Sequence, residues 1–308
     1  MKKKLFELFV SVQNKAIYNL KLFLIYIIHS TTILSLKKLP LYILFQQHKM
    51  KLKVACQLDY DSKENAPLIL MLRPQNGSQQ QLIEENYFLT PNIPINEYQD
   101  VYGNLCQRVI APLGKLSIKT SSIFEISESL ETNFEAAFVP VENLPNEAII
   151  YTLPSRYCES DKLYNLAFEI TQKFSWGYPQ VEAIRSWVKS HLTYEYGRSS
   201  SSTSAFDVSI NRHGVCRDFT HLCLALCRAI NIPARMVVGY LYDLKPMDLH
   251  AWFEAYVGDK WYAFDATQDS PKGGRVVIAY GRDANDVAFA SQFGDMELKS
   301  MWVSVERV

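Results

Sequence analysis

Residues 214–230 of this 308-residue chain read GVCRDFTHLCLALCRAI, and this stretch decides the fold. Apolar residues recur along it at intervals of three and four, the spacing of an amphipathic helix with one buried face. They are Phe219, Leu222, Cys223, Leu226, Cys227 and Ile230. Asn231 can adopt the left-handed cap conformation and Pro233 cannot continue a helix. The sequence therefore predicts a buried helix over residues 217–230.

Cys216 lies at the N-terminal end of this predicted helix, three residues before Phe219, so we expect it to face inward. Free backbone N–H groups and the helix dipole favour negative charge at this end. The thiolate is the nucleophilic form of cysteine. Asp218, in the first turn, suits the dipole and is a candidate cap. Taken alone, Cys216 is also compatible with a small buried residue at a helix end, so its interpretation as a nucleophile depends on His250 and Asp265.

A β-hairpin is predicted downstream, after a buried strand over residues 234–242. The stretch 250–267 reads HAWFEAYVGDKWYAFDAT, two alternating runs around Gly258-Asp259, for which we expect a type II′ turn. With a two-residue loop, Val257 faces Lys260 and His250 faces Thr267. Asp265 is then a diagonal neighbour of His250, about 7–8 Å away along the backbone, which permits a hydrogen bond through the side chains.

Cys216, His250 and Asp265 together match the needs of acyl transfer. Such chemistry uses a thiol nucleophile, a histidine base and a carboxylate that orients the histidine. We therefore predict Cys216, His250 and Asp265 as the catalytic residues.

Other histidines and cysteines offer weaker alternatives. His213 is close to Cys216 in sequence, but no carboxylate is evident to pair with it, and His221 is turned about 140° away around the helix. Cys223 and Cys227, combined with either histidine, would suggest zinc. Their spacing lacks the paired C-x2-C of structural zinc sites, so we favour a helix core face and predict no metal.

Residues 51–126 show short alternating runs between turn markers, which suggests an all-β sandwich. Two helices are predicted next, one after a Ser160 cap with a stripe ending at Phe174, and one opened by Pro179. Strands are expected at 275–280 and near 298–305. We predict a β-sandwich domain over 50–148 and a catalytic domain over 149–308.

Residues 1–49 differ from the rest of the chain. They hold eight lysines against one glutamate, a net charge of +7, and an apolar run that is short and interrupted for a membrane span. No small-residue cleavage site follows. We favour Met50 as the true start, with the leader absent from the mature protein. The alternatives are a basic amphipathic segment on a membrane surface and a degenerate anchor.

Composition narrows the possible partners and compartment. The chain has 32 basic and 32 acidic residues, so residues 50–308 carry a net charge of −7 and lack the basic footprint of a nucleic-acid binder. Six cysteines in a chain of this length are too few for the dense disulfide framework of a small secreted domain. Cys56 and Cys106 are expected to be buried in strands. We expect a cytoplasmic protein with no stable membrane span, or a membrane-associated one if residues 1–49 are expressed.

The segments GVCRDFTHLCLALCRAINIPAR (214–235) and DLHAWFEAYVGDKWYAFDAT (248–267) resemble the core of bacterial transglutaminase-like proteins, a superfamily with a papain-like fold. The likeness includes RYCESDKLYNLAFEI (156–170) and VEAIRSWVKSHLTYEYG (181–197). The stretches LILMLRPQNG (68–77) and DVYGNLCQRVIAPLGKLSIK (100–119) resemble the β-sandwich that such proteins carry N-terminally. The resemblance runs from about Met50 to the end and implies an α+β fold.

The resemblance implies the same roles for Cys216, His250 and Asp265. The backbone N–H of Cys216 is a natural oxyanion donor. Tyr196 and Trp187 are candidates for a second donor, with core aromatics as the alternative role. No cofactor is expected. The substrate would be a peptide or protein, and the oligomeric state is open.

The superfamily holds peptidases, amidases, cross-linking enzymes and inactive scaffolds, so fold alone does not select among them. We predict amide cleavage through a thioester. Hydrolysis is favoured because water is always present and the sequence reveals no amine pocket. The alternative is a silent scaffold that binds peptide or protein.

Overall fold

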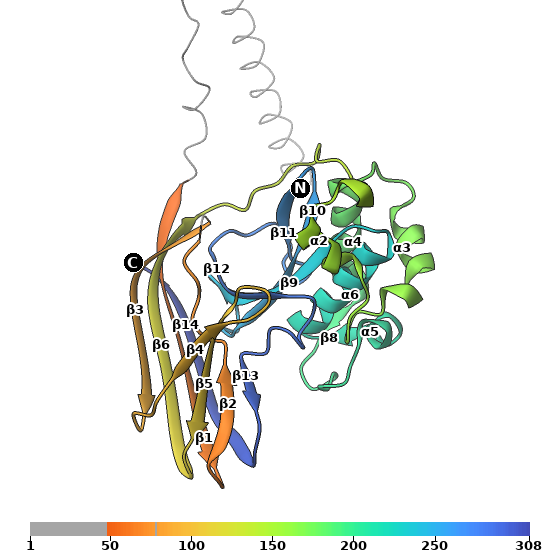
Figure 1. The fold of residues 1–308 in the computed structure, drawn as a ribbon. Helices are drawn as coiled ribbons and strands as arrows, with labels where there is room; N and C mark the ends of the chain where they lie inside the picture. Colours follow the sequence, from red (N-terminus) through yellow and green to blue (C-terminus); the bar gives the residue numbers. More distant parts are fainter. Residues whose placement is uncertain (1–47, 78) are drawn as a thin grey trace, which may run out of the picture. The chain divides into compact units, whose positions relative to one another are not determined.

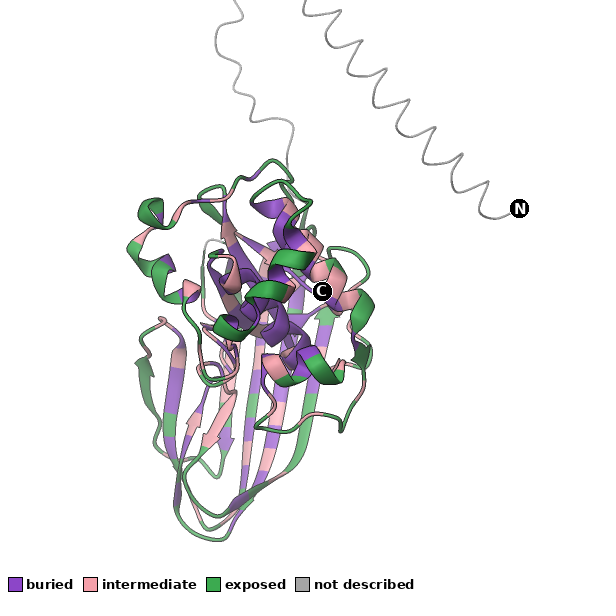
Figure 2. Cartoon of the chain, turned by 90° about the vertical axis from the view of Figure 1, so that its right-hand side faces the viewer, coloured by how far each residue is buried: buried purple, intermediate pink, exposed green. Residues whose placement is uncertain are grey.

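Helix α6 (Cys216–Ala229) lies at the centre of the helical part of the fold, in a computed structural model that describes residues 48–77 and 79–308. Every residue from Asp218 to Arg228 is buried, so the helix is enclosed on all sides rather than on one face. Figure 2 shows this enclosure in purple. Asn231, with φ of 61°, ends the helix in the left-handed conformation that the sequence predicts.

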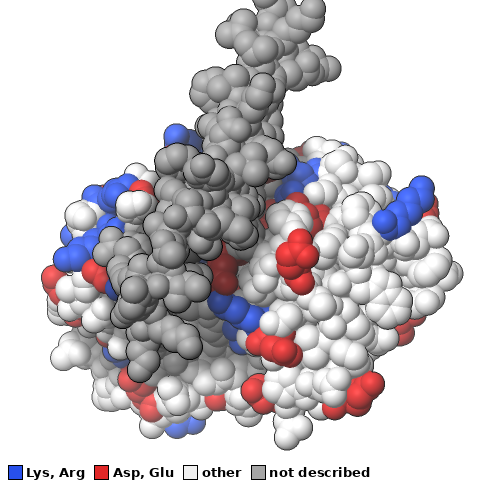
Figure 3. Space-filling view, turned by 90° about the horizontal axis from the view of Figure 1, so that it is seen from above, with Lys and Arg blue, Asp and Glu red and all other residues white. Residues whose placement is uncertain are grey.

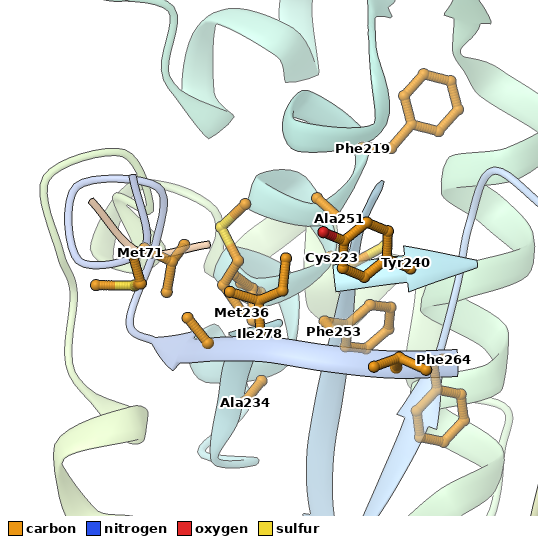
Figure 4. Packing of buried hydrophobic residues seen from close by; sticks show 14 of the residues in the cluster. Met71, Phe219, Cys223, Ala234, Met236, Tyr240, Ala251, Phe253, Phe264 and Ile278 are labelled. Carbon is orange, nitrogen blue, oxygen red and sulfur yellow. The ribbon is translucent and has the colours of Figure 1, made fainter. Parts of the chain in front are cut away.

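A four-stranded antiparallel sheet packs against α6 (Figure 1), in the order β11-β10-β9-β12. The strands are β9 (Ala234–Leu241), β10 (His250–Val257), β11 (Lys260–Phe264) and β12 (Arg275–Gly281). Figure 4 shows Cys223 of α6 close to Ala251 and Tyr240 of this sheet, among the buried hydrophobic residues of the core. Helix and sheet therefore share one apolar interior.

The β10–β11 hairpin has the predicted register. Val257 pairs with Lys260 and Phe253 with Phe264, as a two-residue loop requires. The predicted turn type is wrong, however. Gly258 and Asp259 both have positive φ, 56° and 61°, which is the pattern of a type I′ turn rather than type II′. Type I′ gives the same loop length, so the pairing is unchanged.

Three further helices surround α6: α3 (Tyr164–Thr171), α4 (Tyr178–His191) and α5 (Ala205–Asn211). Pro179 lies in the first turn of α4, as predicted. The helix predicted after Ser160 begins later, because residues 160–162 form a separate 3-10 turn, η4 (Ser160–Lys162). Phe174 was expected on a buried stripe, but it lies beyond α3 and is exposed.

Short elements connect these helices to the sheets. They are η2 (Val141–Asn143), α2 (Asn146–Ile149), η3 (Ile150–Thr152), β7 (Thr193–Tyr194) and β8 (His213–Gly214). Strands β7 and β8 pair in parallel, with Tyr194 opposite Gly214. This pair fixes the chain two residues before α6.

Two more four-stranded antiparallel sheets contain the N-terminal strands. The first has the order β14-β1-β6-β3 and comprises β1 (Lys49–Ser62), β3 (Gln80–Thr90), β6 (Gly114–Ser127) and β14 (Met296–Arg307). The second has the order β13-β2-β5-β4 and comprises β2 (Ala66–Leu70), β4 (Asn96–Gln99), β5 (Leu105–Ala111) and β13 (Ala290–Gln292). The alternation expected after Lys51 is present, because β1 buries Leu52, Val54, Cys56 and Leu58.

The last two strands join sheets that the N-terminal strands build. β14 pairs along β1 from Leu52 to Ser62, and β13 pairs with β2. The sequence places the strand near 298–305 in the catalytic domain and does not foresee its partner. Separate domains over 50–148 and 149–308 stay a prediction, and the leader over 1–49 lies outside the described residues except at its end.

The surface seen in Figure 3 carries acidic and basic side chains interspersed among uncharged ones. Within the described part of the chain, no helix is both long and apolar enough to cross a bilayer. Cys56 and Cys106 are buried in strands with free thiols, as the sequence predicts.

Candidate active site

Cys216 is the first residue of α6, and the turn before it is held by Asp218. One oxygen of the fully buried Asp218 accepts a hydrogen bond from the Val215 N–H at 2.8 Å and another from Ser199 Oγ at 2.6 Å. Arg217 donates to the other oxygen at 2.8 Å. Asp218 thus satisfies a donor at the helix start, as the sequence suggests. Cys216 is partly exposed, whereas the other cysteines are buried.

Gly214 is required two residues before the cysteine. A Cβ atom there would lie 2.5 Å from Cβ of Asp218 and 2.8 Å from its carboxylate. The close approach of the backbone to Asp218 therefore depends on the missing side chain.

His250, the first residue of β10, lines the same cavity as Cys216. Its Nε2 lies 2.8 Å from Oδ2 of Asp265, which directly follows β11, and both side chains are buried. Burial favours the neutral imidazole, but Asp265, with a smaller contribution from Cys216, outweighs it and raises the pKa of His250 to about 9. The predicted histidine and carboxylate are therefore in direct contact, beside the predicted thiol.

Asp265 accepts hydrogen bonds from three residues. His250 and Arg275 Nη2 contact Oδ2, the latter at 3.1 Å, while the backbone N–H and hydroxyl of Thr267 donate to Oδ1 at 2.9 and 2.7 Å. Burial favours the protonated acid, but these partners outweigh it and hold the pKa of Asp265 well below its usual range. Arg275 also stacks over the ring of Trp252, with 4.8 Å between its Cζ and the ring centroid.

The two aromatic residues proposed as oxyanion donors are placed differently. Tyr196 lines the cavity with Cys216 and is 58% exposed, so it is no core aromatic. Trp187 does not line this cavity. It stacks on His191 with centroids 4.3 Å apart, beneath the Arg212 guanidinium, and lines another depression on α4. Trp187 therefore lines a different depression from Cys216, and its role as a donor stays a prediction.

Residues 164–266 match the family model of the transglutaminase-like superfamily. A crystal structure of a "putative cysteine protease" from Cytophaga hutchinsonii is 38% identical, covers 86% of this chain and 92% of that chain, and superimposes with a TM-score of 0.81. The chain belongs to the transglutaminase-like superfamily. An uncharacterized Mycobacterium leprae protein is also similar, 28% identical over 233 residues, 70% of this chain and 82% of that one.

These matches confirm the resemblance drawn from residues 214–235 and 248–267, and with it the papain-like α+β fold. They do not name a substrate for this transglutaminase-like protein. Its site chemistry rests on its own residues.

Tyr194 is a cavity residue that the sequence analysis missed. Burial and, to a smaller extent, the negative charge of Cys216 raise the pKa of Tyr194, which lines the cavity together with that thiol. Tyr194 lies in the same LTYEYG segment as Tyr196, so the aromatic pattern identified the segment but not the residue. Its pairing opposite Gly214 brings it to the start of α6.

The alternative histidines do not line the Cys216 cavity. His213 lies 3.2 Å from a carboxylate oxygen of Glu195, so the expectation that no carboxylate pairs with it is wrong. His221 is fully buried, and its Nε2 accepts the Ala284 N–H at 3.1 Å. Burial lowers the pKa of His221 to about 3, so it stays neutral and structural.

Cys223 and Cys227 have no exposed surface and lie within the apolar core, on the face of α6 predicted for them. Their environment is that of small hydrophobic residues. Across residues 48–77 and 79–308, no group of three potential ligand side chains is arranged to hold a metal ion.

Proposed function

We propose that this protein is a cysteine-dependent amide hydrolase or acyl transferase that uses Cys216, His250 and Asp265. Membership of the transglutaminase-like superfamily supports this class of activity. The observation that carries the assignment is the 2.8 Å contact between His250 and Asp265 in the cavity that Cys216 lines. A nucleophile, a base and an orienting group within one cavity are the parts such chemistry requires.

The reaction begins when the Cys216 sulfur attacks the carbonyl carbon of an amide. The imidazolium of His250 then gives its proton to the leaving nitrogen, the C–N bond breaks and a thioester remains on sulfur. In hydrolysis, water attacks the thioester, its proton passes to His250, and the carboxylic acid leaves as the C–S bond breaks. Asp265 holds the imidazole in orientation throughout.

The oxyanion of each tetrahedral intermediate requires donors next to the sulfur. The backbone N–H of Cys216 is one, because it is a free group at a helix start. Tyr194 is the side chain that we assign as the second donor, since it lines the same cavity as Cys216 and is paired opposite Gly214, two residues before the thiol. Tyr196, on the cavity rim, then contacts substrate rather than the oxyanion.

His250 is protonated at neutral pH, because its pKa is about 9. A protonated imidazole next to the sulfur stabilises the thiolate as an ion pair. Loss of Asp265 would remove the main group that keeps this proton in place.

Thiol alkylation tests the proposal without a known substrate. The rate of iodoacetamide labelling at Cys216, located by peptide mass spectrometry, should be high at pH 6 and fall at least tenfold in His250→Ala. The other cysteines are buried and serve as internal references. Equal rates in wild type and His250→Ala would instead favour the silent scaffold.

Substrate class can then be determined with peptide libraries scored for cleavage, deamidation or amine addition. Active protein should produce one of these mass changes, and Cys216→Ser should abolish it. The cytoplasm as compartment, a peptide or protein partner and the absence of nucleic-acid binding remain proposals of the sequence analysis.

A further inference from the structure

Besides Cys216, Tyr194 and Tyr196, four ionisable side chains line the Cys216 cavity, whose volume is about 230 Å³: Lys189, Lys245, Asp248 and His250. Lys189 donates to the Thr267 carbonyl at 2.9 Å and lies 3.1 Å from the Asp269 carboxylate. Lys245 lies 3.2 Å from Asp243, and His250 is paired with Asp265. Each cation of the cavity wall therefore already has its carboxylate.

Asp248 is the exception. One of its oxygens accepts the Leu249 N–H at 2.7 Å. No Lys or Arg of the described residues lies within salt-bridge distance of it, although the side chain is partly buried. Burial raises the pKa of Asp248, and the Leu249 N–H and the charge of His250 only partly oppose this. A carboxylate withdrawn from water without a cation is unfavourable, so a cationic ligand would relieve the cost.

The wall around Asp248 suits a particular kind of cation. Leu244, Pro246 and Leu249 flank it on the same loop and line the cavity. An aliphatic chain can contact these apolar surfaces while its charged end reaches the carboxylate. A lysine-like alkylammonium group combines both features.

We propose that Asp248 forms a subsite that binds the alkylammonium group of a substrate beside Cys216. The subsite rests on the proposed function, because it serves the reaction at that sulfur. It supplies the amine-binding feature that the sequence did not reveal. The ammonium would belong either to an acyl-acceptor amine or to a basic side chain of the peptide that is cleaved.

In the acceptor case, the bound ammonium first releases one proton to solvent water, and the neutral amine nitrogen then attacks the thioester carbonyl. The C–N bond forms and the C–S bond breaks, while the proton lost by nitrogen passes to neutral His250, which leaves the imidazolium–thiolate pair. In the side-chain case the ammonium stays intact and only positions the peptide. The two sources therefore differ in whether the bound amine is incorporated.

The charge selectivity of Cys216 modification tests the subsite directly. Cationic 2-(trimethylammonium)ethyl methanethiosulfonate and anionic 2-sulfonatoethyl methanethiosulfonate transfer their thioalkyl group to a thiolate and release methanesulfinate. The cationic reagent should react faster with wild type. In Asp248→Asn the cation-to-anion rate ratio should fall roughly two- to fivefold, as expected for one partly solvated charge pair.

Asp259→Asn is the matched control, because it removes the same charge at the hairpin turn, outside the Cys216 cavity, and asparagine tolerates its positive φ. An unchanged ratio in Asp248→Asn, or an equal fall in Asp259→Asn, overturns the subsite. The proposed function fails separately, if His250→Ala leaves the rate with a neutral reagent unchanged.

Two further probes separate the sources of the ammonium. If 1,5-diaminopentane is incorporated into casein by wild type and not by Asp248→Asn, the subsite serves the acceptor. If instead a lysine-containing peptide protects Cys216 from methyl methanethiosulfonate in wild type only, it serves the substrate side chain. Protection and incorporation that are both absent, or both insensitive to Asp248→Asn, contradict the subsite.

Discussion

At the scale of single residues, the site depends on Asp265 as much as on the thiol. Its two oxygens accept hydrogen bonds from His250, Arg275 and Thr267, so the carboxylate is fixed before any substrate binds. A buried charge with this many donors is stabilised in its ionised form and cannot turn away. Orientation of the imidazole is therefore built into the folded state.

The His250–Asp265 pair makes stability depend on pH. The pKa of His250 rises from its ordinary 6.5 to about 9 on folding, so its stabilising contribution is complete below about pH 6.5 and is lost as pH rises through 9. We expect the free energy of unfolding to fall by on the order of 3 kcal/mol across this window. Urea denaturation at pH 6, 7.5 and 9.5 measures it, with His250→Gln as the comparison. Parallel curves for the two proteins would contradict this origin.

Thr267 is expected to matter through its hydroxyl. Thr267→Val removes the 2.7 Å donor to Asp265 while keeping the branched shape, and a lost hydrogen bond to a buried charge costs about 1–3 kcal/mol. Chemical denaturation should show this loss, and Cys216 alkylation should slow as the imidazole loses its fixed partner. Thr267→Ser keeps the hydroxyl and should restore both values. A serine variant as impaired as the valine variant would argue for a packing role instead.

At the scale of elements, the start of α6 and the β10–β11 hairpin bring the reacting groups together. The hairpin register places Asp265 next to His250, because a two-residue loop leaves no freedom to slip. The start of α6 is held by Asp218, which requires the chain to approach closely at Gly214. Helix α6 carries Cys216, and the hairpin carries the other two predicted catalytic residues, His250 at its start and Asp265 directly after it.

Gly214→Ala should disturb the start of α6. The added Cβ would lie 2.5 Å from Cβ of Asp218, so the turn must move, at a cost of about 1–3 kcal/mol in unfolding free energy. Thermal unfolding and Cys216 alkylation should both report it. At Gly77 an added Cβ has nothing within 4 Å, so Gly77→Ala should change stability by less than about 0.5 kcal/mol. Similar losses in the two variants would refute the steric explanation.

At the scale of the whole molecule, the chain returns to its own beginning. β14 pairs with β1, so residues 296–307 complete a sheet built from residues 49–127. Val303 and Val305 are buried with the alternating residues of β1 in the same core. The sheet that contains β1 is therefore complete only after β14 has been synthesised, and β14 follows the strands β9–β12 in the chain.

Removal of β14 is expected to affect the whole described fold. A chain that ends at Asp295 exposes the edge of β1 together with its apolar face, a combination that favours aggregation. We expect the truncated protein to be insoluble or to lose its cooperative thermal transition. In any protein that stays soluble, the buried cysteines should be alkylated faster than in wild type. Removal of the exposed Val308 alone should change the free energy of unfolding by less than about 0.5 kcal/mol. A truncated protein that unfolds as cooperatively as wild type would contradict this dependence.

The local features were predictable from sequence because they depend on neighbours along the chain. The apolar spacing of residues 219–230 predicted α6, and Asn231 predicted where it ends. Gly258-Asp259 predicted the hairpin register that places Asp265 next to His250. The turn type was not, since Gly followed by Asp is compatible with both primed turns and the φ of Asp259 separates them.

Only the tertiary structure brought together residues that no local period links. Arg275 contacts Asp265 from another strand, Tyr194 comes to the start of α6 through the β7–β8 pair, and β14 pairs with β1 across the length of the chain. Asp248 is distinctive only because the neighbouring lysines are engaged elsewhere. Sequence periodicity determines which face of an element is buried, whereas long-range packing decides which side chains meet and which charge is left without a partner.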